Sequence, residues 1–416
     1  GDLRELTRGI NNLISMLLAT PRGASGRAIV AGWVVLALTS RYRAKRVPKD
    51  LDRAISYGEA VISETRQGSP GIASLLWNTS VALGLRYEVG HDVVDLNRAI
   101  SGLAQAMEEA DKANPYAFRI ASALTDALMS RYGLLRESDD LDQAVEVYRL
   151  AIGLAREVGE DETQRHRLSE ILRIRYADGG TADDLQATIQ SCEALLASAS
   201  ATPDTRVSLL LELAHDLHKL YEIDASEPVL DRAIGAQEEA VSLLADDDLN
   251  RPAVLADLGM SYMTRFESFG NERDQEEAIA LYATALHLAP DDAKITFHLQ
   301  AQLGAALGHR YGLSGVPEDL DQSLQLLEAS VNAVGMDDPS LPGVLSNLGL
   351  ALCLCFRRDG DLEYLNRGIE RLEQVLELVG LEDASRCYHH SNLGVALVVQ
   401  FRAIGVQSDI DQAVVL

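Results

Sequence analysis

Three residues have the types and spacing of a helical metal site. Glu212, His215 and His218 are spaced i, i+3 and i+6, so a helix would bring them close to one face. A metal ion would bind the neutral imidazoles and would need a further ligand, which this pattern does not supply. The favoured interpretation is an ordinary polar helix surface, and no metal site is predicted.

A thiol beside two imidazoles is the second group that could do chemistry. Cys387 lies close to His389 and His390, the residue types of a nucleophile and its base. No third orienting group or glycine-rich oxyanion element accompanies them. Cys353 and Cys355 are two residues apart, so a helix would point them to different sides. The chain is therefore predicted to have no enzymatic activity and no cofactor.

The elements that would position these side chains are set by a repeat. A pattern close to D-L-D-x-A-I returns along the chain, and a fixed period of this size is the signature of a repeat array. Its last residue falls 45 residues after the previous one, with a single step of 44, at Ile10, Ile55, Ile100, Val145, Ile189, Ile234, Ile279, Leu324, Ile369 and Val414.

An aromatic residue forms a second anchor, 13 residues before each later anchor of the first kind. These aromatics are Tyr42, Tyr87, Tyr132, Tyr176, Tyr221, Phe266, Tyr311, Phe356 and Phe401. Arginine precedes six of them, and Leu220, Cys355 and Gln400 precede the others. Apolar residues four apart describe one helix face on either side of the loop that separates the anchors. Each repeat is therefore predicted to be two antiparallel helices, A and then B, which must stack on neighbours to bury their apolar faces.

Small and polar residues mark the inside and the ends of these helices. A Leu-Gly pair recurs in helix A, as in Leu348-Gly349, and predicts close helix packing because glycine otherwise weakens a helix. Glycines after the aromatic are expected to end helix A in the left-handed conformation: Gly90, Gly133, Gly270, Gly312, Gly360 and Gly405. Aspartates are expected to cap helix B: Asp95, Asp140, Asp184, Asp319 and Asp409. The recurrent arginine is expected to be structural, at the end of helix A or on the acidic start of helix B.

These motifs resemble the tetratricopeptide (TPR) consensus. The resemblance is carried by Asn347-Leu348-Gly349 with Leu352, by Asn392-Leu393-Gly394, and by Ala278-Ile279 with Ala285-Leu286 and Pro290. TPR units run about 34 residues, so this repeat is a lengthened variant. It is similar to arrays in large fungal and bacterial proteins that also carry a caspase-like CHAT protease or a nucleotide-binding signalling domain. The resemblance implies an all-α fold, a right-handed α-solenoid of about nine TPR-like repeats.

The phase of the repeat at the two termini predicts a segment of a longer array. Residues 1–416 are expected to form a single solenoid whose ends both fall within a repeat. No CHAT-type catalytic motif and no phosphate-binding G-x-x-x-x-G-K-[ST] occurs in the sequence. An effector domain is therefore expected outside these residues.

Composition narrows the class of partner. Acidic residues outnumber basic ones by 63 to 37, for a formal charge of −26, which disfavours nucleic acid and anionic membranes. A protein or peptide partner, basic or amphipathic, is expected, although acidity alone also keeps a long surface in solution. Acidic clusters such as Asp246-Asp247-Asp248, Asp291-Asp292, Asp337-Asp338 and Glu382-Asp383 would form a rim. Four cysteines without a C-x-x-C pair indicate a reduced, cytoplasmic location.

The family resemblance also implies a groove lined by the A helices. Carrying over the positions thirteen, ten, six, three and two before the aromatic gives the polar candidates Arg119, Asp126, His166, Glu170, Arg173, His215, His218, Lys219, His298 and His309. The last two repeats offer mainly Leu350, Cys353, Leu354, Val395, Val398 and Val399. A groove that changes from polar to apolar would suit an amphipathic peptide. The alternatives are a solvated face, packing on further repeats, self-association or a spacer role, and, least favoured, an unrecognised enzyme.

Overall fold

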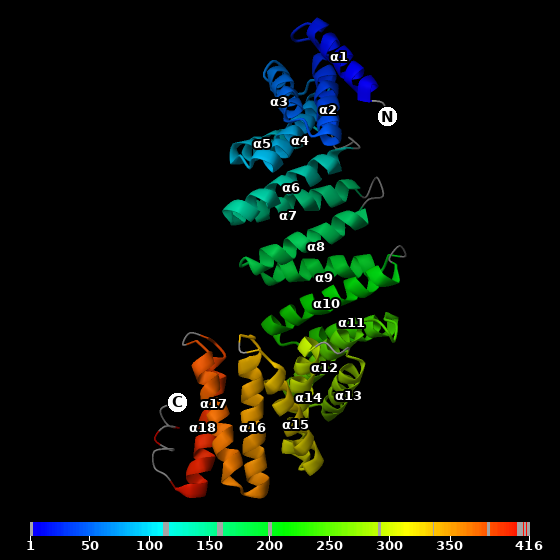
Figure 1. The fold of residues 1–416 in the computed structure, drawn as a ribbon. Helices are drawn as coiled ribbons and strands as arrows, with labels where there is room; N and C mark the ends of the chain where they lie inside the picture. The colour runs from blue at the N-terminus through cyan, green and yellow to red at the C-terminus, as the bar shows by residue number, and fades with distance from the viewer. Residues whose placement is uncertain are drawn as a thin grey trace. The chain divides into compact units, whose positions relative to one another are not determined.

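The fold consists of helices that pack in sequence order. The computed structural model describes residues 3–110, 116–155, 161–198, 202–289, 293–335, 337–380 and 383–405, with Asp411 and Ala413. Every regular element in these ranges is an α-helix (Figure 1), which confirms the all-α class. The chain divides into two compact units, Gly1–Ser200 and Ala201–Leu416. That residues 1–416 form one uninterrupted solenoid stays a prediction.

Unit 1 contains the first nine helices. They are α1 (Leu3–Ala19), α2 (Arg27–Lys45), α3 (Pro48–Ile62), α4 (Ile72–Gly90), α5 (Val93–Glu109), α6 (Ala117–Leu135), α7 (Ser138–Ala155), α8 (Asp161–Ala177) and α9 (Ala182–Leu196). The even-numbered helices carry the aromatic anchor and are the predicted A helices. Each packs against the B helix that follows it and against the B helix that precedes it.

Unit 2 repeats this order with the other nine described helices. They are α10 (Pro203–Asp224), α11 (Glu227–Leu243), α12 (Arg251–Phe269), α13 (Glu272–Leu288), α14 (Ala293–Ser314), α15 (Pro317–Ala333), α16 (Leu341–Asp359), α17 (Leu362–Leu378) and α18 (Arg386–Ile404). In Figure 1, α16, α17 and α18 lie side by side, and each packs on the next. Stacked helix pairs of this kind form an α-solenoid, as predicted.

The two anchors lie in the core that the stacking creates. Tyr42, Tyr132 and Phe266 are buried, as are the small residues of helix B, such as Ala54 and Ala278. One apolar cluster runs without interruption from α4 through α5, α6 and α7 to α8. Because each pair buries its apolar face on its neighbours, the core grows along the array and not around one centre.

Three of the four Leu-Gly pairs are sites of close helix approach, as predicted; a Cβ atom built on Gly394 would lie 3.9 Å from the Ala413 carbonyl oxygen, an ordinary contact. A Cβ atom built on Gly259 would lie 2.8 Å from the Tyr282 ring, and one on Gly304 would lie 2.8 Å from Leu327 Cγ. On Gly349 it would lie 2.7 Å from Leu372 Cγ. In each case helix A touches the B helix of its own repeat through the glycine.

The prediction for the end of helix A is half right. In eight repeats the left-handed residue lies four after the aromatic. It is the predicted glycine at Gly270, Gly360 and Gly405, and a glycine that was not predicted at Gly315; after Tyr176 it is Gly179, three residues later. Gly90, Gly133 and Gly312 instead lie within their helices. In four repeats a non-glycine residue takes the left-handed position, with φ between 48° and 56°: Arg46, His91, Arg136 and Ala225.

Of these four residues, Ala225 offers the simplest test of what the left-handed conformation costs. It ends α10 with φ 48°, and its amide donates to the Tyr221 carbonyl. The left-handed conformation costs an L-residue about 1–2 kcal/mol, and glycine avoids this cost. Part of the gain is offset because glycine has more conformational freedom in the unfolded chain. Ala225→Gly is expected to raise the free energy of unfolding by about 0.5–1 kcal/mol in urea denaturation. Ala197→Gly is the control, because Ala197 ends α9 with φ −74°; it should not stabilise the chain.

The predicted caps of helix B need correction. Asp95, Asp140 and Asp319 lie inside the first turn of their helices and are buried. In α5 the N-cap is Asp92, which accepts a hydrogen bond from the Val94 amide. Asp184 contributes to a cap, since it accepts from the Thr181 amide at 3.3 Å. Asp409 lies outside the described residues.

Candidate functional site

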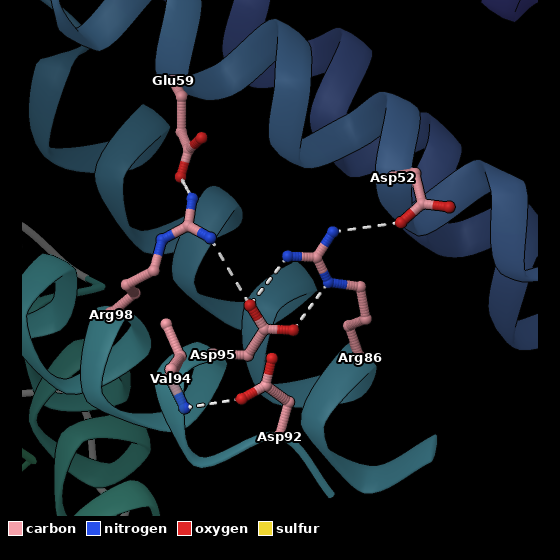
Figure 2. Close-up of polar contacts among 7 residues, drawn as sticks. All are labelled: Asp52, Glu59, Arg86, Asp92, Val94, Asp95 and Arg98. Atoms are coloured by element: carbon pink, nitrogen blue, oxygen red, sulfur yellow. Dashed lines mark hydrogen bonds and ion pairs between the residues drawn. The ribbon is translucent and has the colours of Figure 1, made fainter. Parts of the chain in front are cut away.

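The arginine before the aromatic anchor joins three helices. Arg86 on α4 donates Nε and Nη2 to the two carboxylate oxygens of Asp95 on α5, both at 2.7 Å (Figure 2). Its Nη1 donates to Asp52 on α3, in the preceding repeat, at 3.0 Å. Burial of Asp95 strengthens the pair, because a bidentate arginine–carboxylate contact is strongest away from water. The predicted structural role of this arginine is confirmed.

The same clamp recurs in both units. The arginine reaches the buried aspartate nine residues later in Arg41–Asp50, Arg131–Asp140, Arg175–Asp184, Arg265–Asp274 and Arg310–Asp319. It also reaches the preceding B helix in Arg131–Asn97, Arg175–Asp142, Arg265–Asp231 and Arg310–Glu276. These side chains are engaged within the fold and are not offered to a ligand.

Three repeats replace the arginine of the clamp in different ways. In one, both partners are apolar: Leu220 stands for the arginine and Val229 for the aspartate, and both are buried. In the second, Cys355 takes the arginine's place and Arg358 reaches the preceding B helix at Asp321, 2.7 Å away. In the third, Gln400 Nε2 donates to Asn366 Oδ1 on the preceding B helix at 3.1 Å. A polar contact with the preceding B helix is thus kept in two of the three repeats that lack the anchor arginine.

A second recurrent arginine was missed from the sequence. Arg27, Arg251 and Arg386, at the first position of α2, α12 and α18, donate to the carbonyls that end the preceding B helix. For Arg251 the acceptors are the carbonyls of Val241 at 3.0 Å and Leu244 at 2.7 Å. A cation at a helix C-terminus satisfies carbonyls that have no partner within the helix. The fixed place of these arginines, 15 residues before the aromatic, is the signal that identifies them.

Unit 2 contains a groove lined mainly by A helices. Its volume is about 1040 Å³, and its lining comes mainly from α12, α14, α16 and α18. On α14, the residues at all five positions carried over from the family are part of the groove lining: His298, Ala301, Ala305, Gly308 and His309. On α16 four of the five line it; Ser346 instead is buried.

Of the polar candidates, His298 and His309 lie in this groove. The His309 ring packs edge-on against Phe266 with centroids 5.3 Å apart. The Gln275 amide nitrogen, Nε2, donates to His309 Nδ1 at 3.0 Å. His298 is exposed and its ring contacts that of Phe297. His309 is thus oriented by its neighbours, and His298 faces solvent.

The apolar candidates lie at the far end of the groove, as the columns indicate. Leu350, Cys353, Leu354, Val395 and Val399 line it. Val398 lines an adjoining cavity of about 910 Å³, which shares Val395 and Val399. The sequence reasoning did not nominate Met260, Tyr388 or Arg357, although they too line the groove.

Three candidates lie on α10, outside the lining of this groove. His215 is exposed, and Lys219 is half-buried. His218 Nε2 lies 2.7 Å from Ser261 Oγ, which donates in turn to Gln237 at 2.6 Å. His218 therefore connects α10 to α12 and α11. Among the described residues no group of three or more His, Cys, Asp or Glu side chains is placed to hold a metal ion.

His218 makes stability depend on pH. Burial, and then the charge of His215, lower the pKa of His218 below its ordinary 6.5, against the opposing effect of Glu222. The unfolded chain takes up this proton at a higher pH than the folded chain, so acidification favours unfolding. The Tm is expected to fall from about pH 7.5 to about pH 5.5, and to fall less in His218→Gln. His287→Gln, on the exposed side of α13, is the control; an equal fall in all three chains would contradict the assignment.

The candidates in unit 1 lie on α6 and α8. Asp126 on α6 pairs with Arg167 on α8, and burial raises the pKa of Asp126. His166 and Glu170 lie one turn apart with nitrogen and oxygen 3.8 Å apart. These candidates therefore take part in contacts within and between the A helices.

The other two unit 1 candidates also have partners within the chain. Arg173 Nη2 donates to Cys192 Sγ at 3.5 Å. Arg119 is exposed, with its guanidinium 6.0 Å from the centroid of the Tyr116 ring. Tyr116 stacks in turn on Trp77 at 6.1 Å, so an aromatic face adjoins the polar candidates of unit 1.

The cysteines are mostly core residues. Cys192, Cys353 and Cys355 are buried and Cys387 is exposed. Burial raises the pKa of Cys353 and of Cys355 to about 11. Thiols held protonated in this way are poor nucleophiles.

The acidic clusters have a local structural role in three turns. Asp248, Asp338 and Asp383 each accept a hydrogen bond from the amide two residues later, at 2.8 to 2.9 Å. Aspartate favours such turns because its carboxylate replaces a backbone acceptor. Asp291, Asp292 and Glu382 lie outside the described residues, and use of the rim in binding stays a prediction.

Stacked helix pairs, clamps between repeats and a groove lined by A helices define an α-solenoid repeat protein. No described helix has the length and apolar character needed to span a membrane. No protein-family model matches the sequence, and no curated protein is recognisably similar to it.

The similar solved structures include TPR-repeat proteins. The C-terminal part of a TPR repeat-containing protein from Cytophaga hutchinsonii is 11% identical over 74% of this chain and 98% of that chain, with a TM-score of 0.45. A signal-transduction ATPase with a tetratricopeptide repeat sensor from Pyrococcus horikoshii is 14% identical over 91% of this chain and 54% of that chain, with a TM-score of 0.42. The apo quorum sensor NprR from B. thuringiensis is 15% identical over 89% and 94%, with a TM-score of 0.32.

Proposed function

We propose that this chain is a non-catalytic recognition arm that binds a peptide or protein segment in the groove of unit 2. The groove itself carries the proposal. It is about 1040 Å³ in volume, which is at the upper end of the usual range for binding clefts, and four successive A helices contribute to its lining. An effector domain outside these residues, which the family resemblance suggests is a CHAT protease, would be controlled by that binding.

Exposed apolar side chains on the lining support this proposal. Met260 is 47% exposed, Tyr388 57% and Val395 60%. Each lies on the groove side of its helix. Covering such side chains releases water from apolar surface, and this is the main favourable contribution to most protein association.

Polar residues at intervals along the lining favour an amphipathic partner. Glu267, His298 and His309 lie at the α12–α14 end, and the lining of α16 and α18 is mainly apolar. A segment with one apolar face would bury that face on α16 and α18 and keep its polar residues towards α12 and α14. This arrangement of the lining suits the amphipathic partner expected from the sequence.

The groove is tested with a displayed library of random-sequence peptides, panned on the biotinylated full chain. Selected peptides are expected to lose at least about tenfold in affinity, by fluorescence anisotropy, for the Leu350→Asp/Val395→Asp variant. Leu134→Asp, on the exposed side of α6, is the matched control and should bind normally. Peptides that bind the groove variant as tightly as the parent chain would disprove the proposal.

Further variants ask whether the polar candidates outside this groove take part. Arg173→Glu and the pair His215→Ala/Lys219→Glu place changes on α8 and α10. If the same peptides bind these variants unchanged, recognition is confined to the groove of α12 to α18, and the wider set of polar candidates is dropped.

A second candidate function is self-association. On α2, Ile29, Trp33 and Leu36 are 36%, 51% and 49% exposed and lie at i, i+4 and i+7 on one helix stripe. If this stripe pairs copies of the chain, sedimentation velocity will show a concentration-dependent oligomer that Trp33→Glu dissociates. A monomer at every concentration would exclude this function.

A further inference from the structure

We propose that the groove of unit 2 recognises acidic side chains next to an apolar segment, and that Arg357 and Arg402 bind their carboxylates. This inference rests on the proposed function, because it assigns the partner's chemistry at the same groove. The expected occupant is a protein segment whose apolar side chains are followed by two acidic residues.

The two arginines occupy equivalent places on neighbouring A helices. Each directly follows an aromatic anchor, Phe356 on α16 and Phe401 on α18. Arg357 lines the groove of about 1040 Å³, and Arg402 lines the adjoining cavity of about 910 Å³. Because the two cavities share Val395 and Val399, both guanidinium groups border one apolar surface.

Neither arginine is used by the fold. Both are exposed, and in the part of the chain that the structure describes neither forms an ion pair with an Asp or Glu side chain. The neighbouring Arg358, by contrast, pairs with Asp321 at 2.7 Å and with Asp359 at 2.8 Å. In a chain with 63 acidic and 37 basic residues, two cations on neighbouring A helices without an acidic side-chain partner are available to an external carboxylate.

Acidic groups elsewhere on the lining do not neutralise this end. Asp383 lines both cavities, but it precedes α18 and accepts hydrogen bonds from Ser385, at the opposite end of the helix from Arg402. Glu267 is on α12, two A helices away from Arg357. Among the described lining residues, the C-terminal ends of α16 and α18 thus contribute Arg357 and Arg402 and no acidic side chain.

Apolar residues lead up to each arginine along one helix stripe. Leu350, Leu354 and Arg357 are spaced i, i+4 and i+7 on α16. Val395, Val399 and Arg402 repeat that spacing on α18. Each helix thus offers two apolar side chains and then a cation, all from one side.

An exposed apolar residue six positions before the aromatic, with an arginine directly after that aromatic, recurs on a third helix. On α2, Leu36 is 49% exposed and Arg43 follows seven residues later, also exposed. Where the residue six positions before the aromatic is instead polar, at Asp126, Glu170 and His215, the residue seven later is Gly133, Ala177 and Glu222. Two further apolar residues at this position, Val81 and Met260, are followed seven residues later by Glu88 and Glu267, so the arginine is a particular feature of α2, α16 and α18.

The distance between helices sets the expected spacing of the carboxylates. Neighbouring packed helices lie about 8–10 Å apart, and an extended chain advances about 3.3 Å per residue. An extended segment crossing α16 and α18 would meet the two arginines with acidic residues about three positions apart. A basic segment would be repelled here, although the total charge of −26 favours one.

The experiment repeats the peptide selection on two chains, the parent and Arg357→Glu/Arg402→Glu. Peptides selected on the parent are expected to carry Asp or Glu beside apolar residues, and peptides selected on the variant should carry Lys or Arg there. Parent-selected peptides should bind about fivefold more weakly to either single variant and about thirtyfold more weakly to the double variant, with a weaker dependence on salt. Arg273→Glu, which makes the same charge change on α13 at a side chain that is 83% exposed, should bind as the parent does.

Circular dichroism confirms that each variant is folded, and the outcomes separate the two proposals. Peptides that require Leu350 and Val395 but show no acidic preference and no loss in the double variant would overturn this inference and leave the proposed function standing. Failure to select any peptide that depends on the groove would overturn both.

Discussion

Replacing Arg265 with leucine is expected to lower the free energy of unfolding by about 3 kcal/mol. Arg265 donates Nε and Nη2 to Asp274 at 2.7 and 2.8 Å, and Nη1 to Asp231 at 2.5 Å. The Asp274 side chain is 3% exposed. Without the guanidinium, its carboxylate stays buried with Asn271 Nδ2, 3.2 Å away, as its remaining side-chain donor. Asp231 contributes little to the cost because its side chain is 50% exposed.

A natural variation within the chain indicates how the loss can be reversed. Leu220 and Val229 hold the places of the arginine and the aspartate in another repeat, and both are buried. Arg265→Leu/Asp274→Val copies that pair and removes the unpaired carboxylate. The double variant is expected to recover at least half of the loss, because replacing both partners of a buried pair by apolar groups is often nearly neutral.

Urea denaturation followed by circular dichroism measures both variants and the single Asp274→Val. The resulting double-mutant cycle should give a coupling of about 2 kcal/mol. Arg273→Leu is the control, since its side chain is 83% exposed, and it should stay within about 0.5 kcal/mol of the parent. Additive losses from Arg265→Leu and Asp274→Val would show that the two residues act independently and that the clamp is not a unit.

The repeated parts of the fold could be predicted because two anchors keep a fixed phase. The aromatic at Tyr132 and the Ala144-Val145 pair both lie in the core, and the period alone places them on facing helices. Their arginine and aspartate partners, such as Arg131 and Asp140, share that period, but the period does not show that they touch. The aspartates were assigned to helix caps for this reason, when their carboxylates receive the guanidinium instead.

The left-handed helix ends were only partly predictable for a different reason. Any glycine shortly after the aromatic is predicted to end helix A, but in most repeats the left-handed conformation falls on the residue four positions after the aromatic. Ala225 takes that position although its side chain is unfavourable there. Packing of both flanking helices holds the backbone in this conformation, and local propensity does not show it.

For the candidate site, columns carried over from a known family located the lining on α14, α16 and α18 but not its chemistry. Sequence patterns show that Arg357 and Arg358 are both cations. Contacts show that Arg358 is paired within the fold and Arg357 is not. Which charged residues are free to bind is a property of the folded chain, so it could not be read from spacing.

The glycine column leads to the second large effect, at Gly349. A Cβ atom there would lie 2.7 Å from Leu372 Cγ and 3.0 Å from the Gly368 carbonyl oxygen. Leu372 is fully buried, and a backbone carbonyl cannot move without displacing α17. Gly349→Ala is therefore expected to cost about 1 kcal/mol, since the overlap outweighs alanine's better helix propensity. Gly349→Val adds two methyl groups to the same contact and should cost about 3 kcal/mol.

The contrast with an unobstructed glycine decides whether packing is the cause. Gly84 lies inside α4, and a Cβ atom built on it would have no neighbour within 4 Å. Gly84→Ala should raise the free energy of unfolding by about 1 kcal/mol, because only the helix propensity changes. If Gly349→Ala stabilised the chain to the same extent, α16 and α17 would not be in the close contact that the Leu-Gly column implies. Opposite signs for the same substitution at the two positions would show that the glycine is kept for the approach of helix B.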